Sequence, residues 1–181
     1  MTTRSNLLLA AVILALAPAV SAEEPPKPAP EMANLKTFEG SWSCEGTANP
    51  GPMGPGGATK TSVTSKTDLN GYWQTGTVKS TGGGMPGTME GRFHMTYDTG
   101  AKQYVMVWVD NTGGWSEATS PGWMSDKMVF TGDSHMGGQK VSVRDTFAKK
   151  ADGSLEHVWE GQVDGKWAPF GTETCRKAAG K

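Results

Sequence analysis

The chain has 181 residues, with 17 lysines and arginines, 18 aspartates and glutamates, 25 glycines and two cysteines. A formal net charge of −1 without a lysine or arginine cluster excludes the positive surface that nucleic-acid binding requires. Beyond the N-terminal segment no apolar run reaches the roughly 18 residues of a membrane-spanning helix, so we expect no stable membrane insertion.

The N-terminal residues 1–22 have the organisation of a secretory signal peptide. A single positive charge, Arg4, precedes the apolar run Leu7–Val20, and small residues follow up to Ala22. We therefore expect cleavage after Ala22 and export of the mature chain, either to the periplasm or out of the cell.

The remainder divides into a linker, one domain and a short tail. Residues 23–31 are rich in proline and have no periodic apolar residue, which is typical of an extended linker. Residues 32–178 are enough for one domain, and 179–181 form a C-terminal tail. At the start of the domain three apolar residues at helical spacing predict a helical turn that caps a barrel end. They are Met32, Leu35 and Phe38.

Short runs of β-forming residues separated by turn chemistry predict an all-β domain. Asn70-Gly71 and Asp164-Gly165 are the strongest hairpin signals, because a type I′ turn needs positive φ at both central residues. Consecutive hairpins predict a single up-and-down antiparallel meander barrel of about ten strands, whose closure places the first strand beside the last. The expected strands are Gly40–Ala48, Thr59–Leu69, Tyr72–Ser80, Thr88–Asp98, Lys102–Asp110, Trp115–Ser120, Lys127–Gly132, Gln139–Ala148, Ser154–Gln162 and Lys166–Lys177.

The two cysteines, Cys44 and Cys175, lie on the first and last expected strands. Two cysteines in an exported protein, without the spacing of a metal site, predict a disulfide. That bond requires the two strands to be neighbours, which is the relation that barrel closure provides. It also removes both thiols as catalytic nucleophiles.

Alternation along the strands predicts which residues face the barrel interior. On strand 88–98 the apolar set Met89, Phe93, Met95 and Tyr97 shares one face and is expected inside. Strand 102–110 is apolar on both faces, so alternation leaves its inner face undecided. One face of this strand carries Tyr104, Met106 and Trp108, and the other carries Val105, Val107 and Val109. Either face can be the inner one.

A meander also predicts which connections share one end of the barrel. The odd-numbered connections cover 49–58, 81–87, 111–114, 133–138 and 163–165. They bring a methionine-rich set to one rim, which we expect to be the mouth: Met53, Met85, His135 and Met136. Thioethers suit the entry of an apolar ligand. They can also bind Cu(I), and the third alternative is that they fill gaps beneath glycine-rich loops.

Few residues point to catalysis or metal binding. The histidines His94, His135 and His157 have no ligand spacing, and nothing assembles a nucleophile with a base. We therefore assign no catalytic or metal-binding residue and expect no cofactor. Arg144 can reach into the cavity and hold an anionic head group by charge-assisted hydrogen bonds. The alternative is an arginine of the surface or rim that pairs with a carboxylate.

Gly40-Ser41-Trp42 resembles the GxW signature of lipocalins and other calycin barrels. A longer set of residues follows it in the chain: Gly84-Met85-Pro86, Gly91, Tyr97-Asp98, Tyr104, Trp108, Asp110, Thr131-Gly132, Arg144 and Arg176. In its order and spacing over residues 32–178 this set resembles the bacterial domain-of-unknown-function family numbered fifteen seventy-nine, whose members are often exported. This resemblance implies a calycin-like β-barrel without an established activity, and the cysteine pair departs from the family.

The lipocalin resemblance also offers a role for Arg176, because lipocalins pack an arginine of the last strand over the signature tryptophan. Alternation opposes this role. If Trp42 and Cys44 point inward and Cys175 bonds to Cys44, Arg176 points outward unless a bulge intervenes.

These observations favour a non-enzymatic carrier or sensor of a small apolar or amphipathic ligand. The expected ligand-binding residues are Phe93, Met95, Tyr97, Tyr104, Trp108 and Arg144. An alternative is a haem- or metal-binding barrel, since Gly40, Trp42 and Gly46 resemble the start of calycin-like haem proteins, with His157 as the axial ligand. Another is an envelope protein-interaction module, and an enzyme comes last. The oligomeric state stays open.

Overall fold

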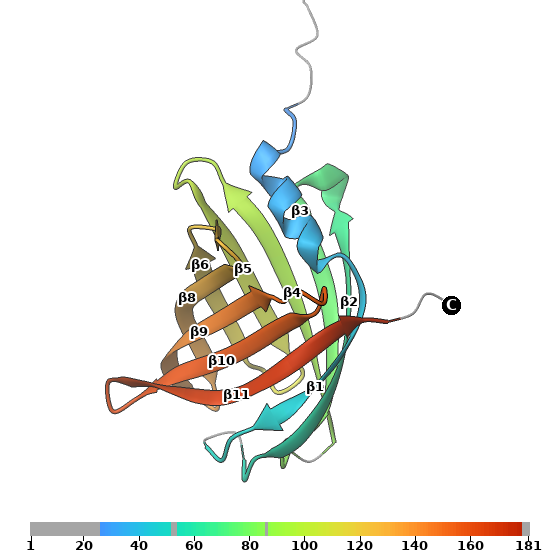
Figure 1. Ribbon diagram of the computed structural model, residues 1–181. Helices are drawn as coiled ribbons and strands as arrows, with labels where there is room; N and C mark the ends of the chain where they lie inside the picture. Colours follow the sequence, from blue (N-terminus) through green and yellow to red (C-terminus); the bar gives the residue numbers. More distant parts are fainter. Residues whose placement is uncertain (1–25, 52–53, 86, 179–181) are drawn as a thin grey trace, which may run out of the picture.

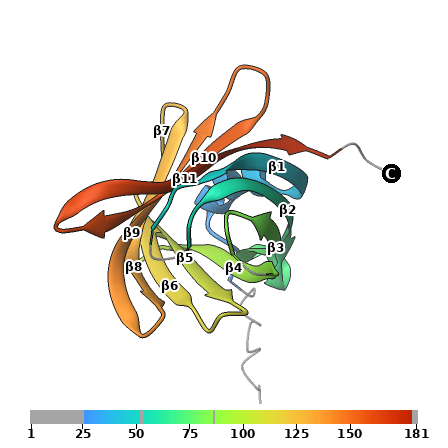
Figure 2. The same cartoon turned by 90° about the horizontal axis from the view of Figure 1, so that it is seen from below.

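The backbone winds through consecutive hairpins into a closed antiparallel barrel (Figures 1 and 2). The structure is a computed structural model that describes residues 26–51, 54–85 and 87–178. The expected signal peptide, the tail at 179–181 and Met53 lie outside these residues. In the described part of the chain, no helix is long and apolar enough to cross a membrane.

Ten strands form the barrel wall, which confirms the predicted all-β meander. Each strand pairs with its neighbours in sequence, β1 pairs with β11, and β6 closes the remaining gap by pairing with β8. The strands are β1 (Gly40–Ala48), β2 (Gly57–Asp68), β3 (Trp73–Gly82), β4 (Thr88–Asp98), β5 (Gln103–Asp110), β6 (Trp115–Ser120), β8 (Lys127–Met136), β9 (Gln139–Lys149), β10 (Leu155–Val163) and β11 (Lys166–Lys177). A two-residue strand that the sequence did not predict, β7 (Trp123–Met124), pairs with the start of β8.

Asp164-Gly165 forms the predicted two-residue hairpin between Val163 and Lys166, with φ values of 51° and 74°. Asn70 and Gly71 also have positive φ, 56° and 92°, but the connection there is longer than predicted. It runs from Asp68 to Trp73 and contains a short 3-10 helix, η2 (Leu69–Gly71). The expected connection at 133–138 was wrong, because β8 continues to Met136. The turn there consists of Gly137-Gly138 alone, whose φ values of 57° and 78° allow a two-residue hairpin.

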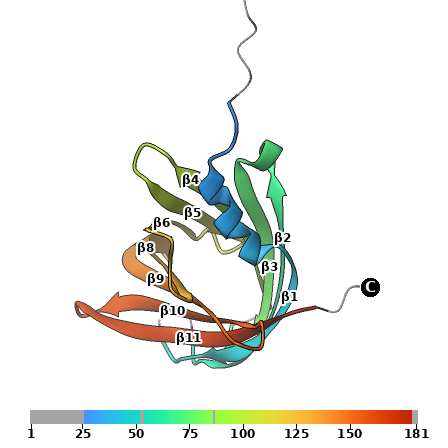
Figure 3. The same cartoon turned by 45° about the horizontal axis from the view of Figure 1, so that its top comes forward.

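A 3-10 helix, η1 (Pro30–Phe38), lies across one end of the barrel (Figures 1 and 3). Because a 3-10 helix has three residues per turn, Met32, Leu35 and Phe38 fall on one face, and Leu35 and Phe38 are buried. The indole N–H of Trp42 donates to the Phe38 carbonyl at 3.0 Å. The helix therefore caps this end, as the apolar spacing predicted.

The seam between the first and last strands carries the predicted disulfide. Cys44 and Cys175 are directly opposite each other in the β1–β11 ladder and are bonded. The bond confirms both the pairing and the closure on which it depends.

The interior next to η1 is tightly packed. Met95, Tyr104, Met128 and Phe130 are each at most 2% exposed. The same packing settles the inner face of β5, because Tyr104 and Met106 are buried whereas Val109 is 42% exposed.

Candidate ligand-binding interior

The inner wall farther from η1 carries aromatic rings that lie flat over glycines. A Cβ atom added to Gly76 would lie 2.2 Å from Cζ of Phe93, and one added to Gly91 would lie 2.0 Å from Cη2 of Trp108. The β3–β4 and β4–β5 ladders thus place each ring where the neighbouring strand has no side chain. These rings cover the wall and do not project toward the centre.

The opposite wall repeats this arrangement. A Cβ atom on Gly171 would lie 2.1 Å from Cζ2 of Trp159, and one on Gly161 would lie 2.3 Å from the Phe170 ring. The β10–β11 register shifts next to Trp159. Phe170 is left out of the ladder there, and its ring covers Gly161.

Some inner-face side chains in this half of the barrel are partly exposed, although small neighbours on the same faces, such as Thr61, Ser80 and Ser116, are buried. The partly exposed residues are Val63, Val78, Met89, Trp108, Val141 and Trp159. We refer to the part of the inner wall that carries these partly exposed side chains as the accessible half.

A charged cluster lies between the two halves, on the inner faces of β9, β10 and β11. His157 Nε2 is 2.9 Å from Asp145 Oδ1, and His157 Nδ1 is 3.2 Å from Glu173 Oε1. The ring of Phe147 stacks on His157 at 4.5 Å and meets Phe38 of η1 edge-on at 5.0 Å. His157 therefore rests on the packed half next to η1 and faces the accessible half.

Two carboxylates keep His157 protonated. Burial alone would lower the pKa of His157, but the hydrogen bonds to Asp145 and Glu173 outweigh it and raise the pKa to about 9. The side chain is therefore an imidazolium at neutral pH, with both N–H groups donating to carboxylates.

A further carboxylate, Asp110, ends the inner face of β5. It accepts hydrogen bonds from the indole N–H of Trp108, the backbone N–H groups of Thr112 and Gly114, and the Thr112 hydroxyl. Burial raises the pKa of Asp110, but these hydrogen bonds outweigh it and hold the pKa below its usual value. Asp110 therefore orients Trp108 while remaining charged.

The predicted ligand-binding residues divide between the two halves. Met95, Tyr97 and Tyr104 belong to the packed half, where the Tyr104 hydroxyl accepts from Asn34 at 2.7 Å and donates to the Glu31 carbonyl at 3.0 Å. Phe93 lies over Gly76 but is buried in the same core, whereas Trp108 lies over Gly91 and is partly exposed. Of the predicted apolar ligand-binding residues, Trp108 is therefore the one that the structure places in the accessible half.

Arg144 does not reach the interior. It is paired with Thr131 and Glu160, on the outer face opposite that of buried Phe130. Its Nε and Nη2 atoms lie 2.7 and 2.8 Å from the Glu160 carboxylate, and its guanidinium stacks 4.6 Å above the Trp167 ring. Of the two alternatives for Arg144, the structure shows the surface arginine that pairs with a carboxylate.

The described residues of the predicted rim do not all lie on the same side of the barrel wall. Met85 is partly exposed in the β3–β4 connection, and Met136 ends the inner face of β8. His135 lies on the outer wall, where it stacks on Trp115 at 4.0 Å. These two rings line an outer groove of roughly 360 Å³ together with Glu117, Asp133 and Lys140.

Sequence reasoning missed Asp145 and Glu173 as site residues. A signal for Glu173 was present, because an inward Cys175 places the residue two positions before it on the same face. Asp145 had the weaker signal of strand parity on β9, where the sequence left the direction of Arg144 open.

Comparisons with known proteins agree with this architecture. A family model described as "Protein of unknown function (DUF1579)" matches residues 27–177. The chain belongs to this family. Among solved structures, this DUF1579 barrel is similar to the crystal structure of Rv2717c from M. tuberculosis, with a TM-score of 0.62 and 12% sequence identity over 84% of this chain and 100% of that chain. Identity this low shows a shared fold alone. The comparison with curated proteins gives no match.

The lipocalin role offered for Arg176 fails in this DUF1579 barrel. Arg176 points outward with a 67% exposed side chain and lies 3.7 Å from Asp152. The one register shift between β10 and β11 lies beside Trp159 and does not alter the pairing of Cys44 with Cys175. Lys177, the next residue, places its ammonium 5.3 Å from the Trp42 ring centroid.

The haem alternative does not fit the surroundings of His157. Axial ligation needs a ring nitrogen with a free lone pair, and both nitrogens of His157 are engaged by carboxylates. In the described part of the chain, the grouping closest to a metal site is Cys44, Glu173 and Cys175, whose two sulfurs form the disulfide. The described residues around His157 therefore do not suit a haem iron.

Proposed function

We propose that this protein is a non-enzymatic binder of a small amphipathic ligand, which enters the half of the barrel away from η1. The observation that supports this proposal is the set of partly exposed inner-face residues there, which includes Trp108 and Trp159, whereas Met128 and Phe130 next to η1 are fully buried. Aromatic rings flat against glycines supply apolar contact area without filling the centre.

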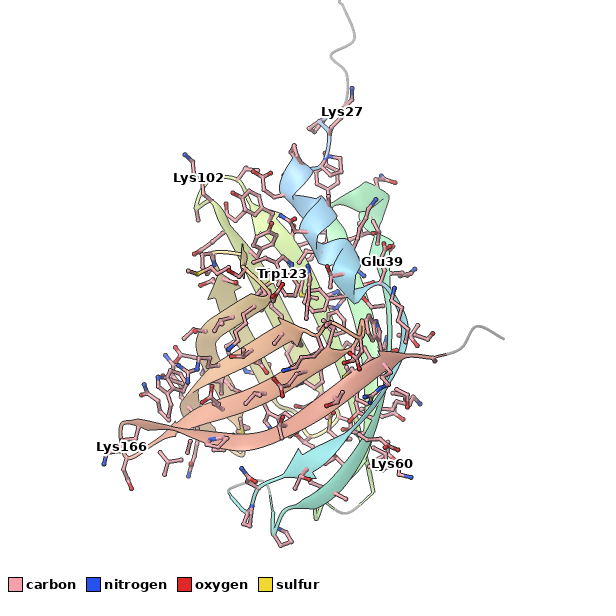
Figure 4. All side chains as sticks on the ribbon, viewed as in Figure 1. Lys27, Glu39, Lys60, Lys102, Trp123 and Lys166 are labelled. Carbon is pink, nitrogen blue, oxygen red and sulfur yellow. A yellow bond between two sulfur atoms is a disulfide. The ribbon has the colours of Figure 1, made fainter. Side chains whose placement is uncertain are left out.

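The closed end gives the ligand a single direction of entry. Leu35 and Phe38 of η1 seal one end, and Trp123, labelled beside η1 in Figure 4, donates its indole N–H to the Asn34 carbonyl at 3.1 Å. The glycine-rich connections stand at the other end. A ligand bound with its apolar part against Trp108 and Trp159 would meet the His157 cluster at the inner end of its path.

Neighbouring residues of β3 provide a matched test. Val78 faces the interior beside Gly91, whereas Thr77 faces outward. We expect purified protein to bind the neutral dye Nile red and to release it to dodecanol. Val78→Trp should abolish this binding by filling the interior, and Thr77→Trp should retain it. Absence of binding by the wild type, or equal binding by both variants, would overturn the proposal.

A further inference from the structure

We propose that the interior selects a ligand whose polar end is a cation, such as an alkylammonium group, over one that ends in a carboxylate. This inference rests on the proposed binding function and adds the charge of the ligand to it.

Carboxylates outnumber cations on the inner faces of the described strands. The inner faces carry the carboxylates of Asp110, Asp145 and Glu173, and one cation within the strands, His157, which contacts Asp145 and Glu173. Three lysines share the inner-face parity but are exposed at strand ends: Lys149, Lys166 and Lys177. Lys166, for example, lies at the tip of the β10–β11 hairpin (Figure 4). An entering carboxylate would therefore find no unpaired cation in the described interior.

The cluster retains unused acceptor capacity. His157 occupies Oδ1 of Asp145 and Oε1 of Glu173, while Oδ2 and Oε2 receive no hydrogen bond from the described residues. One imidazolium cannot neutralise two carboxylates, so a negative charge remains at the inner end of the entry path. In a region partly shielded from water, that charge attracts a cation more strongly than it would at the surface.

An independent observation at the same level of the barrel also points to a ligand. The hydroxyl Oγ1 of Thr59 is buried and has no hydrogen-bond partner in the described structure. Thr59 and Glu173 both pair with Gly46, one from each side. A buried hydroxyl without a partner is costly, and Thr59 can accept a hydrogen bond from an ammonium group on the inner face.

The aromatic wall suits the same ligand. Trp108 and Trp159 present partly exposed indole rings on the inner face, and indole faces attract cations. A carboxylate would gain nothing from these faces. The ring contacts and the carboxylates therefore favour one sign of ligand charge.

The experiment compares three amphiphiles with the same alkyl chain: dodecylammonium, dodecanol and dodecanoate. Each is titrated at neutral pH below its micelle concentration, with displacement of Nile red as the readout. We expect dodecylammonium to bind about tenfold more tightly than dodecanol and dodecanoate to bind most weakly. Asp145→Asn combined with Glu173→Gln should remove the preference for dodecylammonium. Asp133→Asn, which removes an outer-wall carboxylate paired with Lys140 at 2.8 Å, should keep it.

The outcomes separate the two proposals. If dodecanol does not bind, the proposed function fails. If dodecanol binds but dodecanoate binds as tightly as dodecylammonium, the proposed function stands and the charge inference is overturned. Glu173→Gln alone provides a second test if the double variant does not fold, and it should reduce the ratio of dodecylammonium to dodecanol affinity.

Discussion

The interior histidine gives the folded state a pH dependence that can be measured. The pKa of His157 rises from 6.5 to about 9 on folding because Asp145 and Glu173 accept its two N–H groups. Since a change of one in pKa corresponds to about 1.4 kcal/mol, this rise corresponds to about 3 kcal/mol of stability. A group whose pKa is higher in the folded state stabilises most below its unfolded pKa. The contribution is therefore complete below pH 6.5 and is lost as the pH rises through 9.

Guanidinium unfolding of the oxidised protein between pH 6 and roughly pH 9.5 tests this reasoning. The free energy of unfolding of the wild type should fall by about 3 kcal/mol relative to that of His157→Gln over this interval. His94→Gln is the control, because His94 lies on the outer face and contacts the Trp73 ring rather than a carboxylate. Parallel pH profiles for the wild type and His157→Gln would refute the assignment of an interior imidazolium.

Three further predictions concern other parts of the barrel. Cys44→Ser or Cys175→Ser should lower the melting temperature, consistent with a loss of up to about 5 kcal/mol for a loop closed over 131 residues; unchanged melting would contradict the role of the disulfide in closure. Gly91→Ala should destabilise by about 1–3 kcal/mol in chemical denaturation, because the new Cβ would lie 2.0 Å from the Trp108 ring; no loss would show that the ring moves freely. Arg144→Ala should cost about 1 kcal/mol or less and leave amphiphile binding unchanged in the Nile red assay, since Arg144 lies outside; a loss of binding would contradict its position.

Sequence patterns predicted much of this fold because its determinants are local or simply topological. Hairpin turns such as Asp164-Gly165 depend on adjacent residues, and the pairing of Cys44 with Cys175 follows from closure. β7 was missed because a two-residue strand carries no alternation. The end of β8 was misplaced because Asp133 and Ser134 are typical turn residues, while the neighbouring β6 supplies the pairing that keeps them extended.

The candidate site was harder to predict, because its decisive residues contradict the rule that charged side chains face water. The possibility that Arg144 faces the interior followed from its alternation with Val143 and Asp145, which did not show which of the two faces is inside. Val143 is in fact the buried neighbour at 9% exposure, and Asp145 shares its inner face. Whether β9 adds a positive or a negative charge to the interior therefore depends on which of its two faces points inward. The residue composition of β9 does not decide this.

The disulfide determines which residues of β11 face the interior. Cys175 can bond to Cys44 only with both side chains on the inner face, and this orientation also turns Glu173 inward. Glu173 pairs with His157, and His157 pairs with Phe147, two residues from Asp145. A slip of one residue at the seam would turn Glu173 outward and leave the imidazolium with one carboxylate. The bond that closes the barrel therefore also fixes the register in which β9, β10 and β11 bring the three charged groups together.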